Sequence, residues 1–125
     1  MRPAAKPVAA LMALEAASLA VMSSLHLTSA LAGGSKPYDP TDAGIAEAII
    51  CLVLVTGATA LIRGVPEARA IALGSVMFAI LGFVVGLTLT VRGGSAVDIA
   101  YHATVLPLLL VTARLLAAGP KARWA

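Results

Sequence analysis

Four long apolar blocks, separated by short polar segments, account for most of this 125-residue chain. The blocks run from about 8 to 32, 43 to 62, 66 to 91 and 96 to 118. Each is long enough to supply the ~20 residues that cross a ~30 Å hydrocarbon core. Because lipid cannot hydrogen-bond the backbone, each block is predicted to be an α-helix. The pattern therefore predicts an all-α fold, a single membrane domain in which four helices span the bilayer as a bundle.

Turn-forming residues mark the ends of these blocks. The segment 33–40 is rich in Gly, Pro, Ser and Asp and ends the first helix. Thr41 or Asp42 is expected to cap the second helix at its N-terminus. Gly64 is expected just past the end of that helix, and Pro66 is expected to open the third.

A secretory signal peptide is the alternative interpretation of the first block. Arg2 and Lys6 precede the apolar stretch, and residues 30–32 have the small-x-small form of a cleavage site. Against this, the stretch is longer than the usual 7–15-residue core of a signal peptide. The block also contains Glu15 and His26. These features favour a retained helix.

Composition strengthens the membrane interpretation. The chain is 60% hydrophobic and 12% charged, whereas an ordinary soluble domain is roughly a quarter charged. This composition argues strongly against a soluble globular domain and excludes a disordered chain. The net charge of +3 comes from residues that flank the apolar blocks, not from a basic stripe with aromatics that would indicate nucleic-acid binding. One cysteine, Cys51, excludes an internal disulfide and a cysteine-cluster metal site.

The distribution of basic residues predicts the orientation. Seven fall on the side of the termini: Arg2, Lys6, Arg63, Arg69, Arg114, Lys121 and Arg123. Lys36 and Arg92 fall on the other side. The positive-inside rule then places both termini in the cytoplasm of a cell whose plasma or inner membrane holds the protein. Tyr38 and Tyr101 are expected at the outer interface and Trp124 at the inner one, as an aromatic belt.

Ionisable residues inside membrane helices are costly and are therefore functional candidates. His26, Glu47 and His102 lie at similar estimated depths of ~6–9 Å from the outer ends of three different helices. We expect them to converge in the outer third of the bundle as a ligand site, with Tyr101 or Asp98 beside them. A structural polar network is the alternative for the same residues.

Two further acidic residues admit both structural and functional interpretations. Glu15 shares a face of the first helix with His26, but it lies nearer the inner, cytoplasmic end and is separate from the other polar residues. It is either a ligand-binding carboxylate or the partner of Arg114 or Arg63 in an ion pair. Asp98 fits the acidic position of a capping box that begins at Ser95.

The third block has small residues where the others have ionisable ones. Gly82 and Gly86 form a small-xxx-small face, which predicts close packing against another helix. Packing within one bundle is favoured. A homodimer or a larger membrane partner through this face is the alternative.

The favoured function is non-catalytic: a small membrane protein with an outward-side polar pocket that binds a small amphipathic ligand, or an accessory subunit of a larger protein. No G-x-S-x-G, P-loop or H-E-x-x-H motif is present, so no catalytic residue is assigned. No cofactor is predicted.

Two alternatives come from other classes. The position of Glu15 midway along the first helix of a four-helix protein of this length resembles, in plan, the small multidrug-resistance exporters, and this resemblance implies a proton-coupled carrier. Only Glu15 carries it, and the aromatic pocket of those exporters has no counterpart here. Alternatively, His26 and His102 could ligate haem b, or His26, His102 and Glu47 a metal ion.

Overall fold

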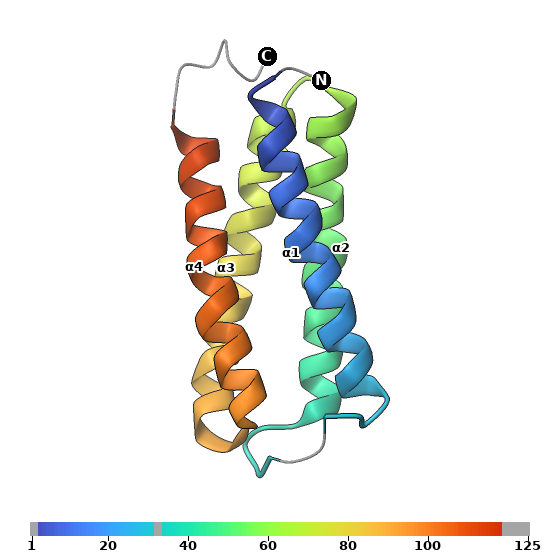
Figure 1. Ribbon diagram of the computed structural model, residues 1–125, viewed down its shortest axis with the longest axis vertical. Coiled ribbons are helices and arrows are strands. Elements are labelled where there is room, and N and C mark those ends of the chain that lie inside the picture. Colours follow the sequence, from blue (N-terminus) through green and yellow to red (C-terminus); the bar gives the residue numbers. More distant parts are fainter. Residues whose placement is uncertain (1–2, 32–33, 119–125) are drawn as a thin grey trace.

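The computed structural model describes residues 3–31 and 34–118, and these form four α-helices (Figure 1). In chain order the helices are α1 (Ala5–Leu27), α2 (Pro40–Arg63), α3 (Ala68–Gly93) and α4 (Ala96–Ala117). All four are long and apolar enough to cross a membrane, judged by length and composition. The sequence prediction of an all-helical chain with four candidate membrane spans is confirmed.

Successive helices run in opposite directions and lie side by side (Figure 1). Each helix packs against the next one in the chain, and α4 also touches α1. The α1–α2 contact is the most extensive and the α1–α4 contact the least. We call the end where α1 begins and α4 ends the terminal end, and the opposite end, with the α1–α2 and α3–α4 connections, the linker end.

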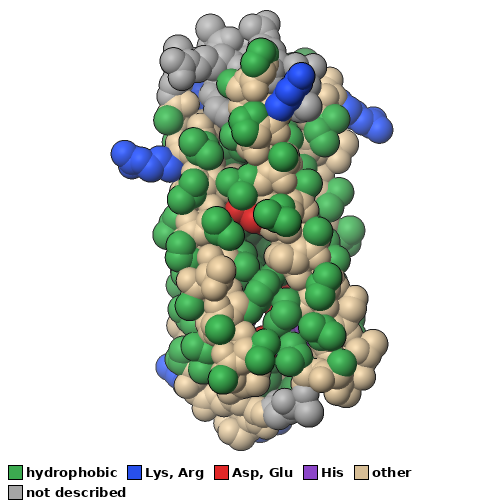
Figure 2. All heavy atoms as spheres, viewed as in Figure 1, with side chains coloured by type: hydrophobic (Ala, Val, Ile, Leu, Met, Phe, Trp, Pro, Cys, Tyr) green, Lys and Arg blue, Asp and Glu red, His purple; other side chains and the backbone are tan. Residues whose placement is uncertain are grey.

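Apolar side chains cover the outside of the molecule along its length. Leu14, Leu52 and Leu81, from three different helices, are each 63–67% exposed. Figure 2 shows hydrophobic side chains over the middle of the viewed face, with basic side chains toward the two ends. So large an apolar surface is typical of contact with lipid.

The interior is built from one apolar stripe on each helix. Met12, Leu19, Leu54, Phe83 and Leu109 are all at most 2% exposed. In α3, Gly82 leaves room for Ile50 of α2, and Gly86 for the ring of His102 of α4. The small-residue face of α3 therefore packs within this chain, which was the favoured interpretation of its pattern.

The starts of α2 and α3 differ from the predicted ones. Asp39, not Thr41 or Asp42, caps α2: its carboxylate accepts the backbone N–H groups of both. Pro40 then occupies the first turn, where its missing N–H costs nothing. At α3, Pro66 precedes the helix, which begins at Ala68. At the other end of α2, Gly64 adopts the left-handed conformation expected of it.

The first helix is displaced toward the terminal end relative to its predicted span. It begins at Ala5 and ends at Leu27, and Thr28 follows it with its backbone N–H bonded to Ser24. The predicted limit at residue 32 lies outside the described residues, as do Gly33, Arg2, Trp124 and the basic residues 121 and 123.

The two connections at the linker end are joined to each other. The backbone N–H of Ser35 donates to the carbonyl of Gly93 at 2.9 Å. A Cβ atom at Gly93 would lie 2.1 Å from the carbonyl oxygen of Ser35, so this approach requires glycine. The contact holds the α1–α2 linker against the end of α3, beside the α3–α4 connection at the linker end.

Candidate functional site

His26 lies at the centre of a buried polar cluster at the linker end. Its Nδ1 atom is 2.7 Å from Oε2 of Glu47, and its Nε2 atom is 3.0 Å from both carboxylate oxygens of Asp98. The hydroxyl of Tyr38 lies 3.0 Å from the same Nε2 atom and donates to Oδ2 of Asp98. We refer to these four residues as the His26 cluster.

Each member comes from a different part of the chain. His26 is in the last turn of α1, Glu47 is the eighth residue of α2 and Asp98 is the third residue of α4. Tyr38 belongs to the linker that crosses from α1 to α2. All four side chains are buried. Since an unpaired polar group in an apolar interior is costly, the mutual hydrogen bonds explain why these residues turn toward one another.

The capping-box interpretation of Asp98 is only half correct. The hydroxyl of Ser95 does accept the backbone N–H of Asp98 at 3.1 Å and caps α4. The carboxylate of Asp98, however, turns into the bundle interior and bonds to His26 and Tyr38. A charge-assisted bond to an imidazole, sheltered from water, outweighs the reciprocal bond to a backbone N–H that water can also satisfy.

Tyr38 is a member of the site that the sequence analysis placed elsewhere. We expected it in an aromatic belt at the interface, but it is only 6% exposed. Burial raises the pKa of the Tyr38 phenol, and the hydrogen bond to Asp98 and the negative charges of Asp98 and Glu47 raise the pKa further. The phenol is therefore a hydrogen-bond donor at neutral pH. Its place before Asp39-Pro40, at a helix start, was the signal available in the sequence.

The acids of the cluster are incompletely satisfied. Oε1 of Glu47 and Oδ1 of Asp98 are buried and form no hydrogen bond within the described part of the chain. No Lys or Arg among the described residues forms an ion pair with either carboxylate. A buried carboxylate oxygen normally has a donor. Oε1 of Glu47 has none in the described structure, whereas Oδ1 of Asp98 keeps its 3.0 Å contact with Nε2 of His26.

His102 lies one turn along α4 from Asp98 and does not join the His26 cluster. Its Nδ1–H donates to the backbone carbonyl of Asp98 at 2.9 Å. Its ring packs 5.0 Å, between centroids, from that of Phe83. The expected convergence of His26 and Glu47 is present, but Asp98 holds the position that we expected His102 to take. The reason is that the i−4 carbonyl satisfies one nitrogen of His102 locally.

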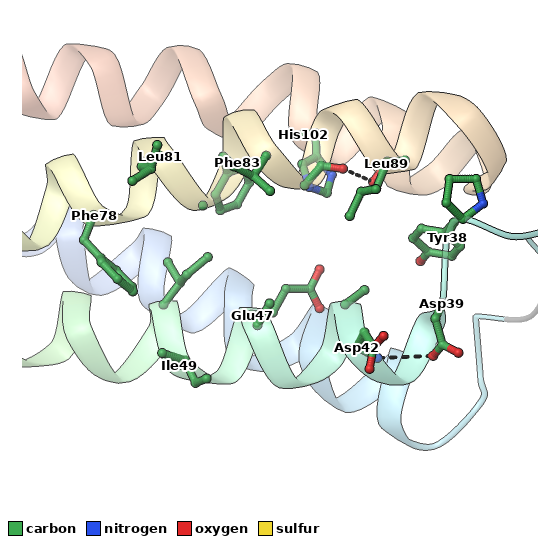
Figure 3. A pocket seen from close by; sticks show the side chains of 18 residues that line it. Tyr38, Asp39, Asp42, Glu47, Ile49, Phe78, Leu81, Phe83, Leu89 and His102 are labelled. Carbon is green, nitrogen blue, oxygen red and sulfur yellow. Dashed lines mark hydrogen bonds between the residues drawn. The ribbon is translucent and has the colours of Figure 1, made fainter.

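A cavity of about 450 Å³ lies between α2 and α3 beside the cluster (Figure 3). Its walls are mainly apolar, and its polar lining residues are concentrated toward the linker end. These polar residues are Tyr38, Asp39, Asp42, Glu47, Thr90 and His102. In Figure 3 Glu47 reaches from α2 into the space between the two helices. We call this cavity the α2–α3 groove.

The groove opens to the side of the molecule. Phe78, Leu81 and Val85 line it and are themselves 45–63% exposed on the apolar outer surface. If that surface faces lipid, the groove is reached from within the bilayer.

Glu15 and Tyr101 lie apart from the His26 cluster, along the contact between α1 and α4. Oε1 of Glu15 accepts the hydroxyl of Thr112 at 2.7 Å, and Oε2 is buried without a hydrogen bond in the described residues. The ion pair with Arg114 or Arg63 is not formed, and Arg114 is exposed. Tyr101 bonds to the hydroxyl of Ser18 at 2.9 Å instead of lying in an aromatic belt. A hydroxyl satisfies these groups at lower desolvation cost than a buried ion pair.

No family model, no curated protein and no solved structure matches this chain.

Proposed function

We propose that this chain is a non-catalytic membrane protein that binds a small cationic amphipathic molecule in the α2–α3 groove. The observation that carries the proposal is Glu47, whose buried carboxylate lines a mainly apolar cavity and leaves Oε1 without a donor. Ligand sites of about 300–1,000 Å³ with apolar walls and a few polar groups are typical of small-molecule binding.

The hydrogen-bonding character of the groove favours a donor-bearing head group. His102 donates its Nδ1–H to a carbonyl, so Nε2 of the neutral ring is an acceptor. Glu47 offers a carboxylate oxygen, and Asp39 and Asp42 at the same end add negative charge. A protonated primary amine supplies both the donors and the opposite charge. Its hydrocarbon chain would lie against Phe78 and Leu81.

The proposed setting is a plasma or inner membrane with the linker end outward. The basic residues support this orientation, because Lys6, Arg63, Arg69 and Arg114 are on helices at the terminal end. A reporter fused after residue 125 that is active only in the cytoplasm would support it. A reporter active only outside would reverse it.

The binding test uses the purified chain in lipid nanodiscs with decylamine as the probe. Isothermal titration should give one saturable site that is weakened at least tenfold by Glu47→Gln, since a hydrogen bond to a charged group contributes about 1.5–3 kcal/mol. Glu67→Gln, at an acid outside the groove, is the matched control and should bind as the parent chain does.

Two further probes separate specific binding from partition into lipid. Decyltrimethylammonium has the charge but no N–H donor and should bind more weakly than decylamine. Equal uptake of both amines by all variants would mean that the groove holds only bilayer lipid, and would overturn the proposal. A dimer seen by native mass spectrometry that disappears when the groove is widened would instead assign the groove to a second copy.

Glu15 supports a second candidate, proton-coupled carriage of the same ligand class. Its buried and unpaired Oε2 atom lies on the α1–α4 contact, where the helices pack least. In proteoliposomes a pH gradient should drive amine accumulation, and Glu15→Gln should abolish that accumulation while leaving equilibrium binding at Glu47 intact. Accumulation that is unchanged in this variant would remove the candidate.

A further inference from the structure

We propose that His26, Glu47 and Asp98 form a binding site for one divalent transition-metal ion, with Zn²⁺ the best match to their donor atoms. The three residues come from α1, α2 and α4, and one ligand atom from each lies within 4.8 Å of the others. All three side chains are buried. The site needs only small side-chain movements because the helices already bring the ligands together.

The unpaired carboxylate oxygens are an independent indication of a ligand. Glu47 is 5% exposed and Asp98 1% exposed, yet each leaves one oxygen without a hydrogen bond in the described structure. Oδ1 of Asp98 is still 3.0 Å from Nε2 of His26, but Oε1 of Glu47 has no donor at all, and buried acceptors are nearly always paired. A cation coordinated by both acids removes this deficit.

The charge of the cluster agrees with a divalent ion. Once His26 has released one proton on binding, two ionised carboxylates and a neutral imidazole carry a charge of −2, which an ion of charge +2 neutralises in surroundings where net charge is costly. The phenol of Tyr38 remains protonated and donates to Asp98.

The donor set also selects the class of ion. Mg²⁺ and Ca²⁺ prefer oxygen ligands throughout, whereas imidazole nitrogen together with carboxylate oxygen suits Zn²⁺ and its neighbours. One ring nitrogen of His26 would release its proton to solvent and bind the ion. The other would keep its N–H donated to a carboxylate, the arrangement that commonly orients a metal-bound histidine.

The proposed ligands differ from the set that the sequence suggested. His102 is not part of this set, because its Nδ1–H donates to the Asp98 carbonyl and the group of converging ligand atoms is made by His26, Glu47 and Asp98.

The test is titration of the metal alone into the purified full-length chain in detergent, followed by calorimetry. We expect one Zn²⁺ per chain, with affinity reduced at least tenfold by Asp98→Asn and by Glu47→Gln. Glu15→Gln is the matched control, because it removes a buried carboxylate of α1 outside the cluster. This control should bind Zn²⁺ as the parent chain does. Because no amine is present, the result does not depend on the proposed groove ligand.

Co²⁺ substituted for Zn²⁺ provides a readout in the unmutated chain, so a variant that fails to fold does not decide the question. Visible absorption bands of low-coordinate Co²⁺ with a nitrogen ligand should appear at one equivalent and be displaced by Zn²⁺. Tyr38→Phe, which leaves all three ligands in place, should retain these bands. Absence of binding by the parent chain, or binding that persists equally in Asp98→Asn and Glu47→Gln, would overturn the proposal.

Discussion

The phenol of Tyr38 donates a hydrogen bond to the carboxylate of Asp98, although the two residues are 60 positions apart in the chain. This bond joins the α1–α2 linker to the first turn of α4. It also places a protonated donor beside an acid that has no basic side chain other than His26 within the described structure to balance it. The linker is therefore part of the candidate site.

Tyr38→Phe should destabilise the protein by about 1–3 kcal/mol, because it leaves a buried carboxylate with one donor fewer. The variant should also change the pH dependence of stability. Burial and Asp98 raise the pKa of Tyr38 above its ordinary value of 10.0. The phenol's contribution is therefore full below pH 10.0 and is lost as the pH rises toward the folded-state pKa. Denaturant titrations in detergent should show a loss of stability at alkaline pH that is smaller in Tyr38→Phe.

Asp39→Ala should lower the melting temperature by removing the N-cap of α2. The backbone N–H groups of Asp42 and Thr41 lower the pKa of the Asp39 carboxyl below 3.8. The stabilisation is present above pH 3.8 and is lost as the pH falls through the depressed folded-state pKa. Asp42→Ala, at the neighbouring acid that does not cap, is the control. An equal acid sensitivity of the two variants would contradict the capping role.

Gly82→Leu should destabilise the protein by about 1–3 kcal/mol by overpacking the α2–α3 contact. A Cβ atom at Gly82 would already lie 2.6 Å from Cδ1 of Ile50. Gly74→Leu is a close control because it is on the same helix and a Cβ there would meet nothing within 4 Å. Thermal melts in detergent compare the two, and equal melting temperatures would show that Gly82 does not face α2.

Thr112→Val should cost about 1–3 kcal/mol, since it leaves Oε1 of buried Glu15 without its donor. Thr104→Val on the same helix removes an exposed hydroxyl that bonds only to its own helix and should have little effect. Adding Glu15→Gln to Thr112→Val should recover part of the loss, because an amide is less costly to bury unpaired than a carboxylate. No recovery in the double variant would argue against the pairing.

The apolar pattern alone determined the number of helices and their approximate limits. It could do so because the backbone in an apolar solvent must satisfy its own hydrogen bonds, and a run of about 20 apolar residues leaves only one way to do this. The same pattern indicated that Gly82 and Gly86 pack against other helices. The identity of the helix caps was less accessible, since Asp39, Thr41 and Asp42 are all good capping residues and only the fold selects among them.

Tertiary structure decided which polar residues meet. Depth along each helix correctly brought His26 and Glu47 together. It did not select between Asp98 and His102, which lie one turn apart on nearly the same face of α4, and the packing of α1 against α4 decided that Asp98 meets His26. The sequence also could not show that the side chain of Tyr38 reaches Asp98. That contact depends on how α1 and α4 pack and on the hydrogen bond between the backbones of Ser35 and Gly93. Local hydrogen-bonding needs define the helices from the sequence, whereas the partners of buried polar side chains are chosen only when helices from distant parts of the chain come together.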